Sequence, residues 1–449
     1  MKTYLSGAMA PVPDEIGAAD LPVTGALPTE LRGRYFRNGP NPLPGTDPGH
    51  NFLGQGMLHG VRIEDGRALW YRNRWVRTAL FDGAAPERRC LDLAATTANT
   101  HVIQHAGRIL SLVENGIPHE VTADLETVGP YDFGGRLTTA MTAHPKVDPA
   151  TGELHFFGYG VRAPYLTYHV LSAAGELTRS TEITVPGPTM MHDFAITENY
   201  VLWLDLPVVF DVDLAANPGM PYRWSDAYAP RIGVMRRDGT EVRWIDVTPG
   251  YVFHVGNAHE DATGRIVLDA VRYDRAGFAS VWRVLGGTPA PAEGLGHGNG
   301  GSLYRWVLDP VTARVSEQRL DDQSVEFPTL NDDYTGRDHQ YVYAIGTPVL
   351  FDDEDGPSIV KYDIAKQTKE SRALPTGWVP GECVFVPAED GTDEDHGWLM
   401  SIVTHETKDA AHLLVLDASD VAGEPVATVM LPRRVPAGFH GSWIADQVY

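Results

Sequence analysis

The sequence predicts an all-β fold of the β-propeller type, and three observations lead to that class. Helical periodicity is scarce over the 449 residues, short runs of alternating apolar and polar residues dominate, and a strand–turn–strand unit recurs. The clearest alternating runs are 108–114, 153–161, 265–273, 341–345, 397–406 and 412–418. Short strands between turn residues are typical of sandwiches, barrels and propellers.

The recurring unit favours a propeller over the other two architectures. Each copy has a strand, an Asp with a polar turn, and a second strand, as in YRWVLDPVTARVSEQRL. The copies lie at 144–157, 304–320, 360–374 and 414–431. Repeated hairpins of this kind are what propeller blades look like in a sequence. Because no convincing boundary divides the chain, we expect one domain over 1–449, with an apolar, Gly/Pro-rich insertion loop at 285–302.

Composition argues against several classes of function. Asp and Glu outnumber Lys and Arg, 59 to 36, and the formal net charge of -23 argues against binding to nucleic acid. Two cysteines predict no disulfide framework and fit a reduced, cytoplasmic compartment. The N-terminal segment lacks the apolar core of a signal peptide, and no apolar run is long enough for a transmembrane helix. Peripheral docking on a membrane stays open.

Histidine is the residue type with the clearest functional signal. The chain has 17 histidines but neither an HExxH motif nor a CxxC pair, so the common zinc signatures are absent. Four of them stand in distinctive settings, near turns or strands: His144, His192, His254 and His440. They lie far apart in the chain, but the inner strands of a propeller meet at one axis and can bring them together. Composition and spacing alone leave the choice among the 17 open.

Seven motifs in order along the chain resemble those of the carotenoid cleavage oxygenase family. They are GRYFRNGPNP (33–42), TAHPKVDPATGE (142–153), HDFAITENYVLWLDLPVVF (192–210), YRWSDAYAPRIGVMRR (222–237), VFHVGNAHED (252–261), EFPTLNDDYTGR (326–337) and GFHGSWI (438–444). One match would be weak, but seven in the family's order, over nearly the whole chain, are highly specific.

The resemblance implies a seven-bladed propeller, with loops and short helices over the active-site face and a non-haem Fe(II) on the axis. The family's four His ligands fall on His144, His192, His254 and His440. The three Glu residues that orient ligand rings fall on Glu114, Glu326 and Glu382. Imidazole suits iron, and a ligating His usually donates its other N–H to a carboxylate or carbonyl, so the residue types fit these roles.

The implied reaction is cleavage of a C=C bond of a carotenoid or apocarotenoid with O₂, giving two carbonyl products. Iron(II) is then the cofactor, O₂ the co-substrate, and a small apolar polyene the binding partner. Two alternatives stay open. One is cleavage of phenolic stilbenes or alkenyl phenols on the same fold. The other is a non-catalytic binding propeller without tightly bound iron.

One position bears on the choice between the two substrate classes. In stilbene-cleaving members of the family, a Lys that contacts the substrate's phenol oxygen directly precedes the Glu that matches Glu114. Val113 stands there in this chain. Valine cannot pair with a phenol oxygen, and a buried unpaired hydroxyl costs about 1–3 kcal/mol. The position therefore favours a hydrocarbon polyene.

A long polyene requires an apolar tunnel, and we expect Val113, Phe81, Trp203 and Phe210 to contact it. If the substrate is dissolved in a membrane, an apolar surface patch is expected as well. The segments 217–224 and 285–302 are the candidates for that patch.

The chain also departs from the family's pattern before one of its strands. The family often reads DGDG before that strand, whereas this chain reads LGQGMLH, with Gln55. His59 ends that motif, and His259 is followed by Glu260 and Asp261 where many members have an aromatic–Glu pair. Because the family motifs place the ligand on His254, we predict that His59 and His259 are not ligands.

Overall fold

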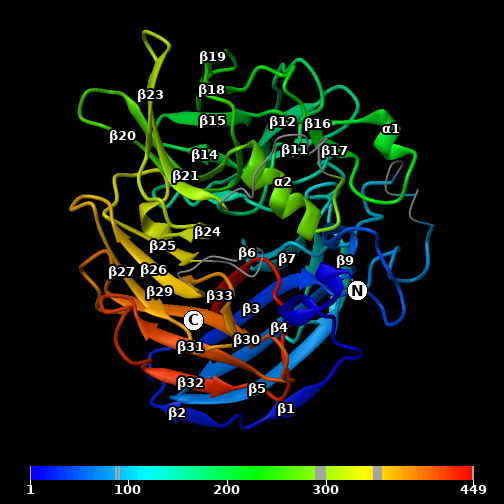
Figure 1. The fold of residues 1–449 in the computed structure, drawn as a ribbon, viewed down its shortest axis with the longest axis vertical. Helices are drawn as coiled ribbons and strands as arrows, with labels where there is room; N and C mark the ends of the chain where they lie inside the picture. Colours follow the sequence, from blue (N-terminus) through cyan, green and yellow to red (C-terminus); the bar gives the residue numbers. More distant parts are fainter. Residues whose placement is uncertain (1, 86–87, 89–91, 289–299, 347–355, 447–449) are drawn as a thin grey trace.

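The computed structural model describes residues 2–446 apart from 86–87, 89–91, 289–299 and 347–355. Within these residues the strands form seven sheets of four to six strands and a separate two-stranded hairpin. The seven sheets are the blades of a propeller (Figure 1), and their strands pair antiparallel. The predicted all-β, seven-bladed propeller is confirmed.

The first four blades follow the chain from its N-terminus. Blade 1 contains β1 (Gly17–Ala19), β3 (Gly33–Pro40), β4 (Gly56–Glu64), β5 (Arg67–Trp75) and β33 (Gly441–Ala445). Blade 2 contains β6 (His101–His105), β7 (Arg108–Leu112), β8 (His119–Val121) and β9 (Thr127–Pro130). Blade 3 contains β10 (Lys146–Val147), β11 (Leu154–Tyr159), β12 (Leu166–Leu171) and β13 (Leu177–Glu182). Blade 4 contains β14 (Phe194–Ile196), β15 (Tyr200–Asp205), β18 (Arg231–Arg236) and β19 (Val242–Asp246).

The other three blades complete the ring. Blade 5 contains β20 (Tyr251–Glu260), β21 (Ile266–Tyr273), β22 (Ser302–Asp309) and β23 (Arg314–Arg319). Blade 6 contains β24 (Val325–Thr329), β25 (Tyr341–Gly346), β26 (Ser358–Asp363) and β27 (Thr368–Ala373). Blade 7 contains β2 (Val23–Gly25), β28 (Trp378–Pro380), β29 (Val384–Pro387), β30 (Gly397–His405), β31 (Ala411–Asp417) and β32 (Ala427–Met430).

The strand–Asp–strand units of the sequence are hairpins, and the Asp side chain explains why the chain turns there. Asp309 accepts hydrogen bonds from the backbone N–H groups of Val311 and Thr312, at 2.8 and 3.0 Å. Asp417 accepts one from Ser419 N–H at 2.8 Å. An Asp carboxylate that caps its own turn in this way replaces backbone pairing and favours the reversal of direction.

Both ends of the chain close the ring by entering the other end's blade. The C-terminal strand β33 pairs with β3 in blade 1, and the N-terminal strand β2 pairs with β32 in blade 7. In Figure 1 the red strand β33 lies beside the blue strands of blade 1. Radial closure leaves few unpaired strand edges, which protects the sheets from pairing with other chains.

In the described part of the chain, two α-helices and a hairpin lie outside the seven blades. The hairpin consists of β16 (Val208–Phe210) and β17 (Tyr222–Trp224), and α1 (Val212–Ala215) lies between its strands in the chain. The longer helix, α2 (Arg275–Val284), is capped by Asp274, whose side chain accepts from Gly277 N–H at 2.7 Å. Such a cap satisfies an otherwise unpaired N–H at the helix start.

The segments with an expected membrane role are described only in part. Residues 289–299 of the predicted insertion loop 285–302 lie outside the described residues. Segment 217–224 is described, and its C-terminal residues form β17. Within the described part of the chain, no helix combines the length and hydropathy that a bilayer crossing requires.

Candidate metal centre

Each blade of the propeller contributes one of the seven residues predicted for the metal site. Blades 1, 3, 4 and 5 supply the histidines and blades 2, 6 and 7 the glutamates. In blade order the residues are His440, Glu114, His144, His192, His254, Glu326 and Glu382. Three of the histidines lie at or just before the first residues of inner strands: His144 precedes β10, His192 precedes β14 and His440 precedes β33.

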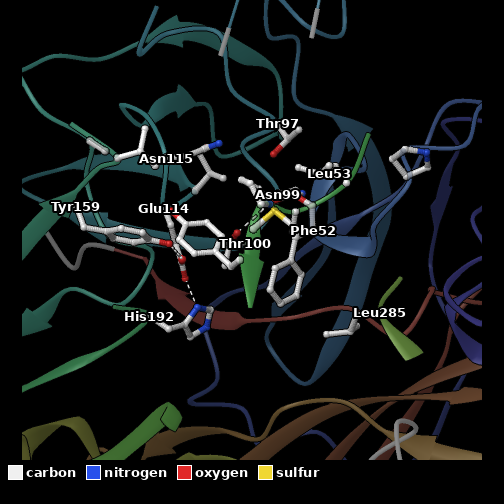
Figure 2. Close-up of a pocket in the computed structure, with 18 of the residues that line it drawn as sticks. Phe52, Leu53, Thr97, Asn99, Thr100, Glu114, Asn115, Tyr159, His192 and Leu285 are labelled. Atoms are coloured by element: carbon white, nitrogen blue, oxygen red, sulfur yellow. Dashed lines mark hydrogen bonds and ion pairs between the residues drawn. The ribbon is translucent and has the colours of Figure 1, made fainter. Parts of the chain in front are cut away.

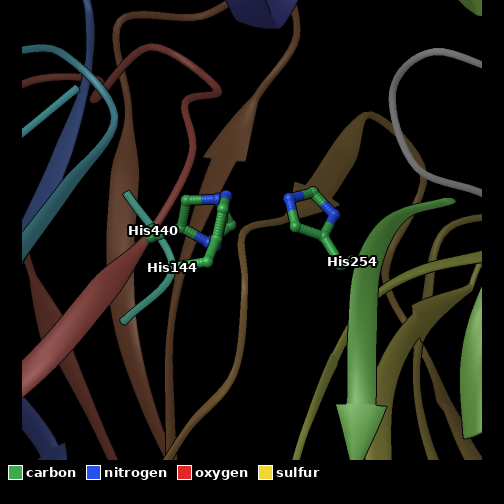
Figure 3. A group of neighbouring side chains, drawn as sticks. All are labelled: His144, His254 and His440. Carbon is green, nitrogen blue, oxygen red and sulfur yellow. The ribbon is translucent and has the colours of Figure 1, made fainter. Parts of the chain in front are cut away.

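The four predicted histidines converge at one point. The Nε2 atom of His192 lies 3.2 Å from that of His144 and 3.3 Å from that of His254. Ring nitrogens of His144, His254 and His440 lie within 4.8 Å of one another, and Figure 3 shows the His254 ring facing the other two. All four side chains are buried. Such a set of closely spaced imidazoles is a donor set that could hold a metal ion.

The three predicted glutamates each contact one of these rings through Nδ1. Oε2 of Glu326 lies 2.5 Å from His254 Nδ1, and Oε1 of Glu382 lies 2.8 Å from His440 Nδ1. Glu114 Oε1 is in direct contact with His192 Nδ1 (Figure 2). These contacts place the Nδ1–H proton on the carboxylate side, which leaves each Nε2 lone pair directed at the centre.

His144 is the fourth ring, and its surroundings differ. Its Nε2 lies 3.9 Å from Glu114 Oε1, and among the described residues no carboxylate is within hydrogen-bonding distance of the ring. Its backbone N–H donates to the Thr142 hydroxyl at 3.1 Å. The three-to-four ratio of Glu to His therefore matches the arrangement that the family resemblance implies.

The second oxygen of each glutamate is also held by a donor. The Tyr159 hydroxyl donates to Glu114 Oε2 at 2.5 Å, and the Tyr273 hydroxyl donates to Glu326 Oε1 at 2.8 Å. For Glu382 the donor is the backbone N–H of Gly441, at 2.8 Å. With both oxygens held, each carboxylate can fix the rotation of its histidine ring.

Burial dominates the electrostatics of the four histidines and of two glutamates beside them. It lowers the pKa of His144, His254 and His440 well below the usual value, so these rings are neutral and can ligate. Burial also disfavours charge on His192, but the contact with Glu114 outweighs it and raises the pKa of His192. Burial raises the pKa of the carboxyl groups of Glu326 and Glu382 to about 7 each.

A cavity of about 1360 Å³ opens against the His cluster. Its wall includes His192, His254 and His440 together with Glu114 and Glu326. Aromatic and apolar side chains form much of the rest, including Phe52, Leu53 and Leu285 (Figure 2), and also Phe210, Phe253, Phe327, Phe439 and Val113. Ligand cavities usually measure about 300–1,000 Å³, so this one has room for a long substrate.

The structure divides the four predicted substrate contacts into two pairs. Val113 and Phe210 line the cavity. Trp203 and Phe81 are not among its lining residues, and here the prediction is corrected. Trp203 is fully buried between blades 3 and 4, where its ring stacks on Phe194 at 5.7 Å. Phe81 packs against Trp75, at 6.0 Å between ring centroids. Sequence patterns could not separate them because an aromatic side chain of the core and one that lines a cavity give the same apolar signal in the sequence.

His59 and His259 lie outside the cluster, as predicted. His59 is buried in β4, and its Nδ1 lies 2.8 Å from the Tyr71 hydroxyl. His259 belongs to β20, and its Nε2 lies 3.4 Å from Asp338 Oδ1. Neither is a member of the metal-compatible groups found among the described residues.

Several residues around the centre were not predicted from the sequence. Phe327 stacks on His254, with ring centroids 4.9 Å apart, and its φ of 52° lies in the left-handed region that non-glycine residues rarely adopt. Asp193 and Lys146 form an ion pair at 3.0 Å beside the cluster. A signal for the pair existed: each charged residue stands within two positions of a predicted ligand, in HPK and HDF.

Comparison with known proteins agrees with this geometry. The family model described as retinal pigment epithelial membrane protein matches residues 9–445. A carotenoid cleavage oxygenase of Mycobacterium tuberculosis is 39% identical, with 98% of this chain and 97% of the relative covered. Carotenoid 9,10(9',10')-cleavage dioxygenase 1 of Arabidopsis thaliana is 35% identical, with 99% and 90% covered.

Solved structures extend the comparison to three dimensions. Cobalt-substituted apocarotenoid oxygenase of Synechocystis superimposes with a TM-score of 0.83 at 27% identity, covering 97% of both chains. Lignostilbene dioxygenase of Pseudomonas brassicacearum superimposes with a TM-score of 0.86 at 29% identity, covering 99% of both chains. On the strength of the family model and the full-length relatives, this chain belongs to the carotenoid cleavage oxygenase family, the family that the retinal pigment epithelial membrane protein model describes.

Proposed function

We propose that the protein is an iron(II)-dependent dioxygenase that cleaves a C=C bond of a carotenoid or apocarotenoid and releases two carbonyl products. The observation that carries the proposal is the convergence of four imidazoles, three of them oriented by buried or partly buried carboxylates, on the wall of a large apolar cavity. The names of the relatives supply the substrate class.

The donor set fits a divalent metal ion. With Nδ1–H directed at a Glu, His192 and His254 present Nε2 lone pairs to each other at only 3.3 Å. The lone pairs of two nitrogen atoms at this distance repel each other. A cation between them turns the repulsion into attraction. His144, His192, His254 and His440 would hold the ion, and an all-imidazole set suits iron. When bound, iron(II) would supply the binding and activation of O₂.

The chain's own residues would position the substrate and keep water out. Glu114, Glu326 and Glu382 hold three rings in fixed orientations. Phe253, Phe327 and Phe439 form apolar wall next to the ligands. A polyene has no polar group along its chain, so apolar walls hold it without leaving a buried polar atom unpaired. Proximity and exclusion of water are then the protein's contributions to rate.

Cleavage of phenolic stilbenes is the second candidate, because the lignostilbene dioxygenase superimposes well on this chain. Val113 argues against it. The side chain lines the cavity next to Glu114 and can neither donate a hydrogen bond nor carry charge. Both oxygens of Glu114 already have partners, in His192 and Tyr159. A phenol oxygen placed against Val113 would therefore find no partner in these two side chains, at a cost of about 1–3 kcal/mol.

Two measurements test the proposal. The first is metal content of protein purified without a histidine tag and reconstituted with Fe(II); we expect close to one iron per chain. Iron far below that level would favour a binding propeller without catalysis. The second is kcat/KM for an apocarotenoid and a hydroxystilbene on one preparation, with products identified by mass. We expect preference for the apocarotenoid and two carbonyl products, whereas preference for the stilbene would promote the second candidate.

A further inference from the structure

A buried carboxylate beside the His cluster receives donors from three different blades. Asp193 is 2% exposed and lies directly after His192. Its Oδ1 accepts from Phe194 N–H at 2.8 Å, and its Oδ2 accepts from Val255 N–H at 2.8 Å. Lys146 Nζ lies 3.0 Å from Oδ1 and 3.3 Å from Oδ2. One carboxylate therefore connects side-chain and backbone groups of blades 3, 4 and 5.

The three connected segments are those that carry three of the four histidines. Lys146 stands two positions after His144, and Asp193 and Val255 stand directly after His192 and His254. The segment around His254 needs such a tie, because the pairing of β20 with β21 shifts register on both sides of Val255. A break in the ladder leaves the backbone less restrained by its neighbouring strand. The Asp193 contact restrains it from the other side.

Stability alone is a weak reason for an ion pair at this place. The Lys146 side chain is 20% exposed and that of Asp193 is 2% exposed. Removing two charges from water costs much of what their attraction returns, and an apolar pair of similar volume often serves stability as well. An apolar pair could not accept the hydrogen bond from the Val255 N–H. It would also lack the directional contact by which Asp193 holds Lys146 in one place. The arrangement suits the fixing of geometry.

We propose that Asp193 and Lys146 are positioning residues for the metal centre, a clamp that sets the spacing of His144, His192 and His254. The inference rests on the proposed function, since it assumes that these rings hold a metal ion. Ligand geometry must be kept within about 0.5 Å for a site to work, and the clamp acts on the backbone within two residues of each ring.

An electrostatic role and a tethering role of the ion pair predict opposite effects for one variant, which allows a decisive test. Lys146→Met removes a positive charge close to the ligands, so a purely electrostatic role predicts tighter binding of a divalent cation. Loss of a tether predicts weaker binding. Asp193→Asn keeps only one acceptor oxygen, so one of the two backbone N–H donors loses its acceptor. The double variant removes the tether while keeping the net charge of the pair at zero.

The experiment titrates Co(II) into metal-free full-length protein and follows the visible absorption of the bound ion, with a thermal melt of each metal-free variant. A matched control is Lys361→Met. Lys361 forms an ion pair with Asp395 at 2.7 Å, and the pair is similarly buried, with side chains 7% and 15% exposed. Lys361 lies in blade 6, away from the histidines. We expect Lys146→Met, Asp193→Asn and the double variant each to weaken Co(II) binding by about tenfold, the lower end for groups that support metal ligands. The double variant should weaken Co(II) binding no more than either single variant does, because each single variant already removes the same tether.

The control should lose thermal stability without losing Co(II) affinity. Wild-type or tighter Co(II) binding in Lys146→Met, with a loss of stability like that of Lys361→Met, would overturn the clamp and leave an ordinary structural ion pair. Failure of the proposed function looks different: the unmodified protein itself would bind no Co(II), and the inference would fall with it.

Discussion

The Nδ1 atom of His254 lies 2.5 Å from Oε2 of Glu326, and both side chains are buried. The other carboxylate oxygen of Glu326 accepts from the Tyr273 hydroxyl at 2.8 Å. This pair explains why a carboxylate begins the EFPTLNDDYTGR motif in an apolar setting: the charge serves a histidine ring and does not face solvent.

Glu326→Gln should weaken metal binding by about 10- to 100-fold, the usual effect of losing a partner of a ligating histidine. The amide can still accept a hydrogen bond but carries no charge to support the ring, and the fold should persist. The measurement is iron content with a competitive Fe(II) titration. A matched control is Glu394→Gln, since Glu394 accepts the backbone N–H groups of Gln340 and Tyr341 at 2.8 Å each, away from the cluster. Equal loss of iron in both variants would contradict an orienting role.

His254→Ala should abolish stoichiometric iron binding, because no other described ring replaces its nitrogen at the centre. His59→Ala is the comparison, since His59 is also buried in a strand but pairs with the Tyr71 hydroxyl. That variant should lose stability and keep its iron. Metal analysis and a thermal melt on the same samples separate the two effects. Full iron and full turnover in His254→Ala would show that the ligand set is wrong.

Phe210→Ala and Trp203→Ala should fail in different ways. Phe210 lines the cavity, so its loss should raise KM for an apocarotenoid by roughly tenfold, which corresponds to about 1.4 kcal/mol of binding. Trp203 is fully buried in the core, where truncation of a large side chain costs about 3–5 kcal/mol of unfolding free energy. Steady-state kinetics and denaturant unfolding of both variants make the comparison. A larger KM change for Trp203→Ala than for Phe210→Ala would contradict the cavity assignment.

The metal-free protein should lose stability as pH falls below about 6.5, the pKa of an exposed histidine. Burial lowers the pKa of His50 to about 3, that of His155 to about 3 and that of His339 to about 4. Between these values and about 6.5 the unfolded chain binds protons that the folded chain does not, so each such group removes about 1.4 kcal/mol per pH unit.

His50→Asn offers a check on this acid sensitivity. His50 Nδ1 accepts from Phe52 N–H at 3.1 Å, and an Asn oxygen can accept the same bond without titrating. Denaturant unfolding at about pH 7.5 and about pH 5 should therefore show a smaller loss of stability in the variant than in the unmodified protein. An unchanged dependence on pH would mean that His50 does not titrate as its burial implies.

The sequence by itself determined the elements of the fold, because their signals are local. Alternation of apolar and polar residues predicted strands such as β21 and β30, and turn chemistry around Asp309 and Asp417 predicted their hairpins. The family motifs then selected four histidines and three glutamates, and the structure brings those seven side chains to one place, one from each blade.

Tertiary structure alone decided which side chains face the cavity and which hold the site in place. Trp203 and Phe210 lie in one apolar stretch of the chain, yet the first is enclosed between two blades and the second faces the cavity, because the orientation of a strand within the ring is not encoded in its alternation. Lys146, Asp193 and Val255 are likewise separate in sequence. Their contact exists only because ring closure places the inner ends of blades 3, 4 and 5 within reach of one carboxylate.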